Sequence, residues 1–308
     1  MPEGTSLYVR HITKKRHGTP RQFARLCERN GLRWIALAAL WQDVRKDGRP
    51  YSKMINSIDT IAKYGAALED QGIEVYTWGY PWQDREESFV ERMVAASPTR
   101  RILLDPELGA NPTRSGSGAG KAKANDHATK LVTLFADAAD CPISLGLSTY
   151  GSGWRLKWFP LLAFTRALVD RFGGRTFIGG QTYTVGEDAV DASIADMVTV
   201  IGKAGGAVQR YDETLANGCQ VVPNFGTYAR YSSGPKKGDV RRKTGNELRA
   251  HLFGFINEGE PVDAMIGWAE NFMTEATWDA LHEFAVAGLF EDEAKDGQFS
   301  VSHYILVP

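Results

Sequence analysis

The stretch Arg101-Ile102-Leu103-Leu104-Asp105-Pro106-Glu107-Leu108 is an apolar, strand-like run that ends in two acids. Side chains alternate faces along a strand, so Asp105 and Glu107 are expected to point the same way. Neighbouring carboxylates at the end of an apolar strand are costly unless they are paired or used, and their repulsion separates their pKa values. The pattern predicts a catalytic pair. The alternative is that both acids cap the following loop or pair with Arg100 or Arg101.

Similar apolar runs recur along the chain and alternate with amphipathic segments. The eight strand candidates are Leu7–Ile12, Trp34–Trp41, Glu74–Tyr80, Arg101–Glu107, Ile143–Tyr150, Thr176–Tyr183, Gln220–Tyr228 and Ala264–Glu270. Helix candidates follow them, the first opening at the capping motif Thr19-Pro20-Arg21-Gln22 and the others covering residues 57–71, 85–96, 125–139, 159–172, 189–204, 246–257 and 274–290. This alternation implies a parallel sheet with right-handed crossovers.

Eight such units in 308 residues predict a (β/α)8 barrel of the TIM type, in one domain over residues 5–290 with a C-terminal tail at 291–308. A doubly wound open sheet is the alternative fold, but no G-x-G-x-x-G follows the first strand. In such barrels the active site lies at the C-terminal ends of the strands, which is where the fourth strand places Asp105 and Glu107.

The bulk composition excludes several classes of function. The chain is 43% hydrophobic and 24% charged with a formal net charge of -1, so no overall field favours nucleic acid or a membrane. Its three cysteines and six histidines are scattered without metal or disulfide spacing, and we expect no cofactor. No apolar stretch has the length of a signal peptide or a membrane span. We therefore expect a protein made in the cytoplasm, and either released by lysis or carried on a virion.

Aromatic and amide side chains cluster at the other strand ends. The candidate substrate-binding residues are Trp41, Trp78, Tyr80, Tyr150, Gln181, Tyr183, Asn224, Tyr228, Trp268 and Asn271. Sugar rings pack their apolar faces on aromatic rings, and their hydroxyls bind amides and carboxylates, so the set predicts a polysaccharide groove. The alternative is that these rings are large core residues.

Other acids and two insertions are open to more than one interpretation. Glu270 is either a second catalytic carboxylate opposite Glu107 or a structural partner of a Lys or Arg, whereas Asp43 and Asp84 are read as loop caps. The glycine-rich stretch at 111–123 predicts a mobile loop beside the groove. After the seventh strand comes a basic run, which is either solvated or suited to a polyanionic substrate. It contains Lys236, Lys237, Arg241, Arg242 and Lys243.

Asp105-Pro106-Glu107 resembles the acidic motif of family 25 glycoside hydrolases, the lysozyme-type muramidases common in phages, and more distantly the end of the family 18 chitinase motif. The resemblance implies that Glu107 is the general acid/base of a retaining reaction and that Asp105 orients the substrate's N-acetyl group. Tyr183 and Trp268 are similar in position to a family 18 Tyr and Trp, and Tyr80 and Tyr150 to family 25 aromatics. The chain departs from family 25 in lacking an acid on the first strand, and from family 18 in having Ile102, Leu103 and Leu104 where further acids are usual.

Three functions follow from these observations. The first is a glycosidase that cleaves an N-acetylated polysaccharide, most simply peptidoglycan, as a lysin does. The second is a non-catalytic glycan-binding or structural barrel in a larger assembly such as a phage, with the apolar tail 299–307 docking on a partner or closing the barrel bottom. The third is a lyase or aldolase, which the absence of lysine from the strand ends disfavours.

Overall fold

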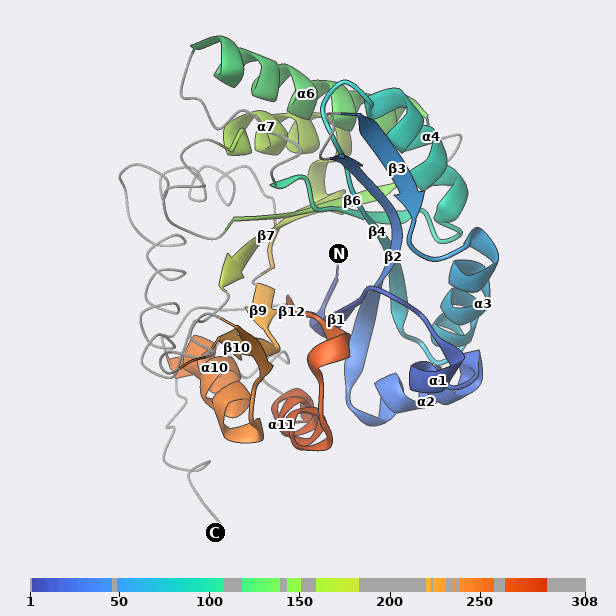
Figure 1. Cartoon of the computed structure of the whole chain (residues 1–308), viewed down its shortest axis with the longest axis vertical. Helices are drawn as coiled ribbons and strands as arrows, with labels where there is room; N and C mark the ends of the chain where they lie inside the picture. Colours follow the sequence, from blue (N-terminus) through green and yellow to red (C-terminus); the bar gives the residue numbers. More distant parts are fainter. Residues whose placement is uncertain are drawn as a thin grey trace.

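The computed structural model describes residues 2–45, 49–107, 118–138, 143–150, 159–182, 220–222, 224–230, 235, 239–257 and 264–286. Within these residues eight parallel strands form a barrel (Figure 1). They are β1 (Gly4–Val9), β2 (Leu32–Val44), β4 (Glu74–Tyr80), β5 (Arg101–Leu104), β6 (Ser144–Tyr150), β7 (Thr176–Thr182), β9 (Asn224–Gly226) and β12 (Ala264–Trp268).

The strand pairings run in one direction around the whole ring. The order is β1, β2, β4, β5, β6, β7, β9 and β12, and β12 pairs in turn with β1. Each of the eight predicted strands is present, so the barrel prediction is confirmed. The short strand β8 (Gln220–Val221) pairs with β7 just before β9 begins.

Helices cover the outside of this ring, as Figure 1 shows. They are α1 (Lys14–His17), α2 (Pro20–Arg29), α3 (Ile58–Glu69), α4 (Glu86–Ala96), α6 (Gly118–Asp137), α7 (Leu161–Phe172), α10 (Gly245–Asn257) and α11 (Glu275–Val286). The predicted capping box at the start of α2 is present, because Thr19 and Gln22 each bond the other's backbone N–H. The predicted helix at 189–204 and the tail at 291–308 lie outside the described residues.

Three features differ from the sequence-based expectation. Strand β2 extends past the barrel rim and pairs antiparallel with β3 (Pro50–Met54), forming a hairpin that was not predicted. Helix α6 begins at Gly118, so the last part of the stretch predicted as a mobile loop is helical. A small separate sheet, β10 (Tyr228–Arg230) with β11 (Val240–Arg242), follows the seventh barrel strand.

Apolar side chains form two layers. The larger one lies between the barrel and its helices and includes Leu7, Phe23, Phe89, Phe135 and Phe164. The smaller one fills the inside of the barrel with residues such as Trp34, Tyr76, Leu103 and Phe177. No helix of the described part is long and apolar enough to cross a membrane.

Candidate active site

The Asp105 side chain lies inside the mouth of the barrel. Asp105 follows β5, and its backbone N–H continues the pairing with β4 by donating to the Gly79 carbonyl at 3.0 Å. Leu103 faces the barrel interior, and alternation places Asp105 on the same face. Asp105 is only 5% exposed, and its Oδ1 has no hydrogen-bond partner among the described residues. Burial raises the pKa of this carboxyl well above its usual value, and the nearby charge of Glu107 raises it further.

Glu107 is half-buried and lies at the end of the described part of this segment, with a backbone φ of 21°. Its charge acts on Asp105, so the two acids are electrostatic neighbours as their spacing predicted. One of them is therefore held in its protonated form more readily than a solvated carboxyl is. A pair of acids with two separate roles requires such a difference between its two pKa values.

Polar side chains from three other strands form a group in the barrel, and one of them, Tyr8, lies near Asp105. Asn224 of β9 is fully buried and donates through Nδ2 to Ser148 Oγ of β6 at 2.7 Å. The Tyr8 hydroxyl of β1 interacts with both, although its geometry is not that of a regular hydrogen bond. Burial raises the Tyr8 pKa, and the charges of Asp105 and Glu107 add to this. Gly179 of β7 leaves room for Asn224, because a Cβ there would lie 2.5 Å from Asn224 Oδ1.

Three aromatic rings line the mouth next to this polar group. Tyr8 lies edge-on to Trp78 and Trp268, with ring centroids 5.7 and 5.1 Å apart, and the two tryptophans are 5.4 Å from each other. Trp78 is fully buried, whereas Trp268, the last residue of β12, is half-buried and is joined to Ala269 by a cis peptide bond. The half-buried indole of Trp268 therefore provides apolar surface at the mouth, close to the acids.

A second aromatic contact joins the neighbouring strands β2 and β4. Trp41 of β2 stacks on Tyr80 of β4, with centroids 4.2 Å apart and an interplanar angle of 12°. A register shift between Ala38 and Leu40 brings Trp41 opposite Tyr80. Bulges commonly re-aim side chains at the rims of barrels, and here the shift turns Trp41 toward the interior cluster.

Glu270 has partners of its own. It lies in the short helix η3 (Glu270–Phe272), is 7% exposed, and its Oε2 is 3.2 Å from His17 Nε2 and 3.9 Å from Arg16 Nη1. The structure thus gives Glu270 the arginine partner that the sequence left as an alternative to catalysis. These contacts tie the end of β12 to α1.

The remaining predicted binding residues and loop caps lie on several different elements. Asn271 is half-buried in η3, and Tyr228 in β10 packs at a tilt on Phe272 with centroids 5.4 Å apart. Tyr150 and Gln181 are opposite each other at the ends of β6 and β7, but their side chains are outside the described part. Tyr183 also lies outside the described residues. Of the two acids read as loop caps, Asp43 accepts from Trp41 Nε1 at 3.3 Å, and Asp84 pairs with Lys123 Nζ at 2.6 Å.

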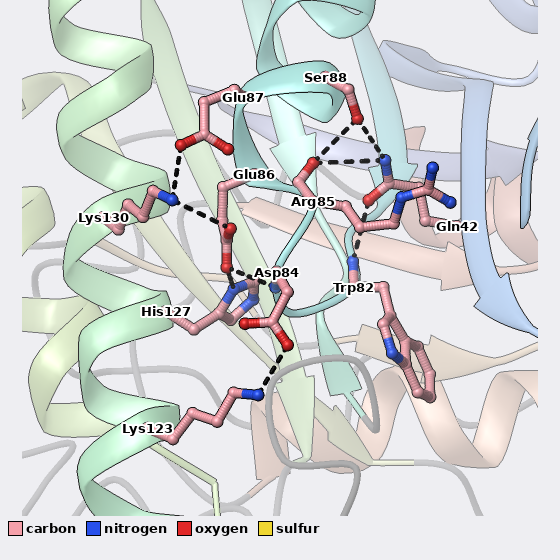
Figure 2. A network of polar contacts seen from close by, with 10 residues as sticks. All are labelled: Gln42, Trp82, Asp84, Arg85, Glu86, Glu87, Ser88, Lys123, His127 and Lys130. Atoms are coloured by element: carbon pink, nitrogen blue, oxygen red, sulfur yellow. Dashed lines mark hydrogen bonds and ion pairs between the residues drawn. The ribbon is translucent and has the colours of Figure 1, made fainter. Parts of the chain in front are cut away.

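A polar network fixes the loop that follows β4, as Figure 2 shows. Gln42 is fully buried, accepts from the Trp82 N–H at 3.2 Å, and lies 3.5 Å from the Arg85 carbonyl and 3.4 Å from Ser88 Oγ. On the other side of the loop, Glu86 is 2.5 Å from His127 Nδ1. Lysines from the same face of α6 complete the network, with Lys130 reaching both Glu86 and Glu87. The network joins β2, the β4–α4 loop and α6.

The basic run after the seventh strand is only partly solvated. Lys243 is 3% exposed, and its Nζ is 2.6 Å from His251 Nδ1 of α10. Arg241 forms a bidentate ion pair with Glu247. The expectation of a solvated run is therefore wrong for Lys243, while Lys236 and Lys237 lie outside the described residues.

Sequence reasoning missed Tyr8 and Ser148. The strand around Tyr8 begins at Gly4 rather than at Leu7, so Ser6 belongs to it as well. Its alternation, with Ser6 and Tyr8 on one face, was the available signal. Ser148 lies two residues before Tyr150, so it shares that predicted residue's face of the strand. No group of three potential metal-binding side chains occurs in the described part of the chain.

Comparison with known proteins identifies the fold. No protein-family model and no curated protein sequence matches the chain. The structure of the spore cortex-lytic enzyme SleL from Bacillus cereus matches with a TM-score of 0.56 and 10% identity, over 91% of this chain and 74% of that one. A chitinase from Chromobacterium violaceum gives 0.55 and 10%, over 93% and 99%. A family 18 N-acetylglucosaminidase from Paenibacillus barengoltzii gives 0.55 and 13%, over 92% and 100%.

These identities establish a shared barrel and nothing finer. Two of the matched structures are described as family 18 enzymes, and the comparisons give no support to the family 25 resemblance.

Proposed function

We propose that this protein is a glycoside hydrolase that acts on an N-acetylated polysaccharide at the C-terminal mouth of the barrel. The observation that carries the proposal is the Asp105 carboxyl, which is buried, has a free Oδ1 among the described residues and lies beside Glu107. Buried polar atoms are nearly always bonded, so an open one at a barrel mouth suits a ligand group. The fold shared with chitinases supports the same conclusion.

In this proposal Glu107 is the general acid and base, and Asp105 assists. Glu107 protonates the glycosidic oxygen as the bond to the anomeric carbon breaks, and the carbonyl oxygen of the substrate's own acetamido group forms a bond to that carbon. Glu107 then takes a proton from the water that opens this intermediate, with retained configuration. Such proton transfer contributes about 10²–10⁴-fold to the rate.

Asp105 is suited to hold the acetamido group during this reaction. Its raised pKa lets it carry the proton of the pair in the free enzyme. As positive charge develops on the substrate, this proton passes to Glu107, which delivers it to the glycosidic oxygen, and the Asp105 carboxylate accepts from the acetamido N–H. The Tyr8 hydroxyl and the Asn224 amide lie on the same side of the mouth and are placed to bond the acetamido oxygen or a sugar hydroxyl. The Trp268 indole provides an apolar face for the sugar ring.

We propose peptidoglycan as the polysaccharide. The support is the match to a spore cortex-lytic enzyme. Delivery by lysis or on a virion remains a prediction, as does any partner bound through the tail.

The experiment compares wild type with Glu107→Gln and with the control Glu91→Gln, which changes an exposed glutamate on α4. Reducing ends released from purified peptidoglycan and from chitin oligomers are measured, and circular dichroism verifies folding. We expect Glu107→Gln to lose at least about 100-fold in kcat while Glu91→Gln retains wild-type turnover. Undiminished turnover in Glu107→Gln refutes the assignment. Binding of a glycan without turnover by wild type favours a non-catalytic module.

A further inference from the structure

The rim beside the mouth carries an unusual set of cations around an aromatic stack. Lys53 of β3 is directly opposite Trp41 of β2, and Trp41 is opposite Tyr80 of β4. Residues opposite each other share one face of a sheet, so Lys53, Trp41 and Tyr80 form a row across three strands. The guanidinium of Arg10, which follows β1, lies over the Trp41 ring at 5.4 Å from its centroid. A cation held over an indole is stabilised by the ring's quadrupole.

The position of Arg10 is fixed by its backbone. Asn56, which follows β3 and is 6% exposed, donates to the carbonyl of Arg10 at 2.9 Å and to that of Ala38 at 2.8 Å. The same side chain accepts from the Ile12 N–H at 2.9 Å. A single buried amide thus ties the segment after β1 to both strands of the hairpin. The backbone from which the Arg10 side chain reaches the Trp41 ring is therefore held by hydrogen bonds.

The positive charge at this rim is only weakly balanced. Arg10 and Lys53 are both exposed, and neither takes part in an ion pair among the described residues. Asp43 is the nearby acid, and it accepts from the Trp41 indole. The positive charge of this region also acts on His11. Partial burial lowers the pKa of His11, and the charges of Arg10, Lys53 and Arg16 lower it further.

The rim is continuous with the acids. Trp41 packs against the interior cluster that contains Tyr8 and Trp78. Tyr80 follows Gly79, whose carbonyl accepts the Asp105 N–H. A polysaccharide bound at Asp105 and extending along β4 and β2 therefore passes Arg10 and Lys53.

We propose that Arg10 and Lys53, mounted on Trp41 and Tyr80, form a binding subsite for a carboxylate carried by the glycan. This inference rests on the proposed glycosidase function and specifies its substrate class as a chain whose sugars bear carboxylates. Arginine recognises a carboxylate through two parallel N–H groups, and contact of the guanidinium with the Trp41 ring lowers the entropic cost of doing so. An uncharged N-acetylglucosamine polymer offers no partner to these cations.

The kinetic test uses two forms of one substrate. Peptide-free peptidoglycan strands carry a lactyl carboxylate on every second sugar, and chemical reduction converts these groups to alcohols without changing the chain. The preference is the ratio of kcat/KM on the acidic strands to that on the reduced strands. We expect wild type to prefer the acidic form by about 10- to 100-fold and the double variant R10Q/K53Q to lose at least about tenfold of this ratio. The matched control K63Q/R166Q removes two exposed charges from α3 and α7 and retains the preference.

A binding arm separates this inference from the proposed function. The Glu107→Gln protein is titrated with short acidic and reduced oligosaccharides, and the His11 ring is followed by NMR. An anion at the rim offsets the neighbouring cations, so acidic ligand is expected to raise the pKa of His11 and bind at least about tenfold more tightly than reduced ligand. Equal binding of both forms, or a preference that survives in R10Q/K53Q, overturns the subsite. If wild type cleaves neither strand, the hydrolase proposal fails while the binding arm still decides the subsite.

Discussion

The substitution Lys243→Met tests whether the lysine behind the mouth is buried at a large electrostatic cost. Lys243 follows β11, is 3% exposed, and contacts His251 Nδ1 at 2.6 Å. Burial lowers its pKa from 10.5 to about 7; the charge of Glu247 opposes this, and that of Arg241 adds to it. The backbone N–H of Lys243 donates to the Thr227 carbonyl. Thr227 in turn donates to the Trp268 carbonyl through its backbone N–H and to the Ala269 carbonyl through its hydroxyl. The lysine therefore belongs to the layer that supports Trp268.

The sign of the effect follows from proton linkage. Between about pH 7 and 10.5 the unfolded chain keeps a proton on Lys243 that the folded protein has released. The free energy of unfolding then rises with pH by about 1.4 kcal/mol per pH unit, to a total of at most about 5 kcal/mol. Methionine has no such proton, so the variant lacks this rise. It also leaves His251 Nδ1 without its donor, a cost of about 1–3 kcal/mol that does not change in this window.

These two contributions predict a change of sign. At pH 7 Lys243→Met is more stable than wild type by about 1–3 kcal/mol, and near pH 10 it is less stable by up to about 2 kcal/mol. Urea unfolding followed by tryptophan fluorescence at several pH values measures the difference, and Lys63→Met on the exposed face of α3 serves as control. A difference between variant and wild type that stays constant from pH 7 to 10 refutes the reasoning.

Two further substitutions probe the polar network of the β4–α4 loop and the mouth. Glu86 is 3% exposed; burial raises its pKa, but hydrogen bonds from His127 and the backbone outweigh this and lower it to about 2. Its stabilisation is complete above about pH 4.5 and is lost as the pH falls toward 2, so Glu86→Gln should cost about 1–3 kcal/mol at pH 7 and almost nothing at pH 2 in urea unfolding. Tyr8→Phe keeps the ring between Trp78 and Trp268 but removes the hydroxyl near Asp105, Ser148 and Asn224. We expect an unchanged melting temperature and about a tenfold lower kcat on peptidoglycan, and an unchanged kcat excludes a role for the hydroxyl in the reaction.

The barrel could be predicted because each strand and helix is encoded locally. Strand β4 matches its predicted bounds at both ends, and α2 begins at the Pro20 that follows its capping residue. Asp105 could be placed at the mouth for the same reason, since alternation along one strand and the polarity of the barrel are enough.

The parts that failed depend on contacts between distant segments. Helix α6 starts at Gly118 in a glycine-rich sequence that disfavours helix, and it is held by packing on α4 and α7. Glu270 pairs with His17, which is far away in the sequence, so no local pattern could predict this contact. The β2–β3 hairpin did have a local signal, the Asp47-Gly48 dipeptide between two extended runs. The register shift that turns Trp41 toward the barrel interior had no such signal in the sequence.

The filling of the barrel explains why Asp105 is poised as it is. Below the mouth the interior is closed by Trp34, Tyr76, Leu103 and Phe177, all 1% exposed or less. Among the described residues, these apolar side chains desolvate the Asp105 carboxyl from beneath. A sugar seated over Trp268 closes the open end as well, and this further favours the protonated acid until charge develops on the substrate. The apolar plug and the bound glycan thus act on the same proton from opposite sides.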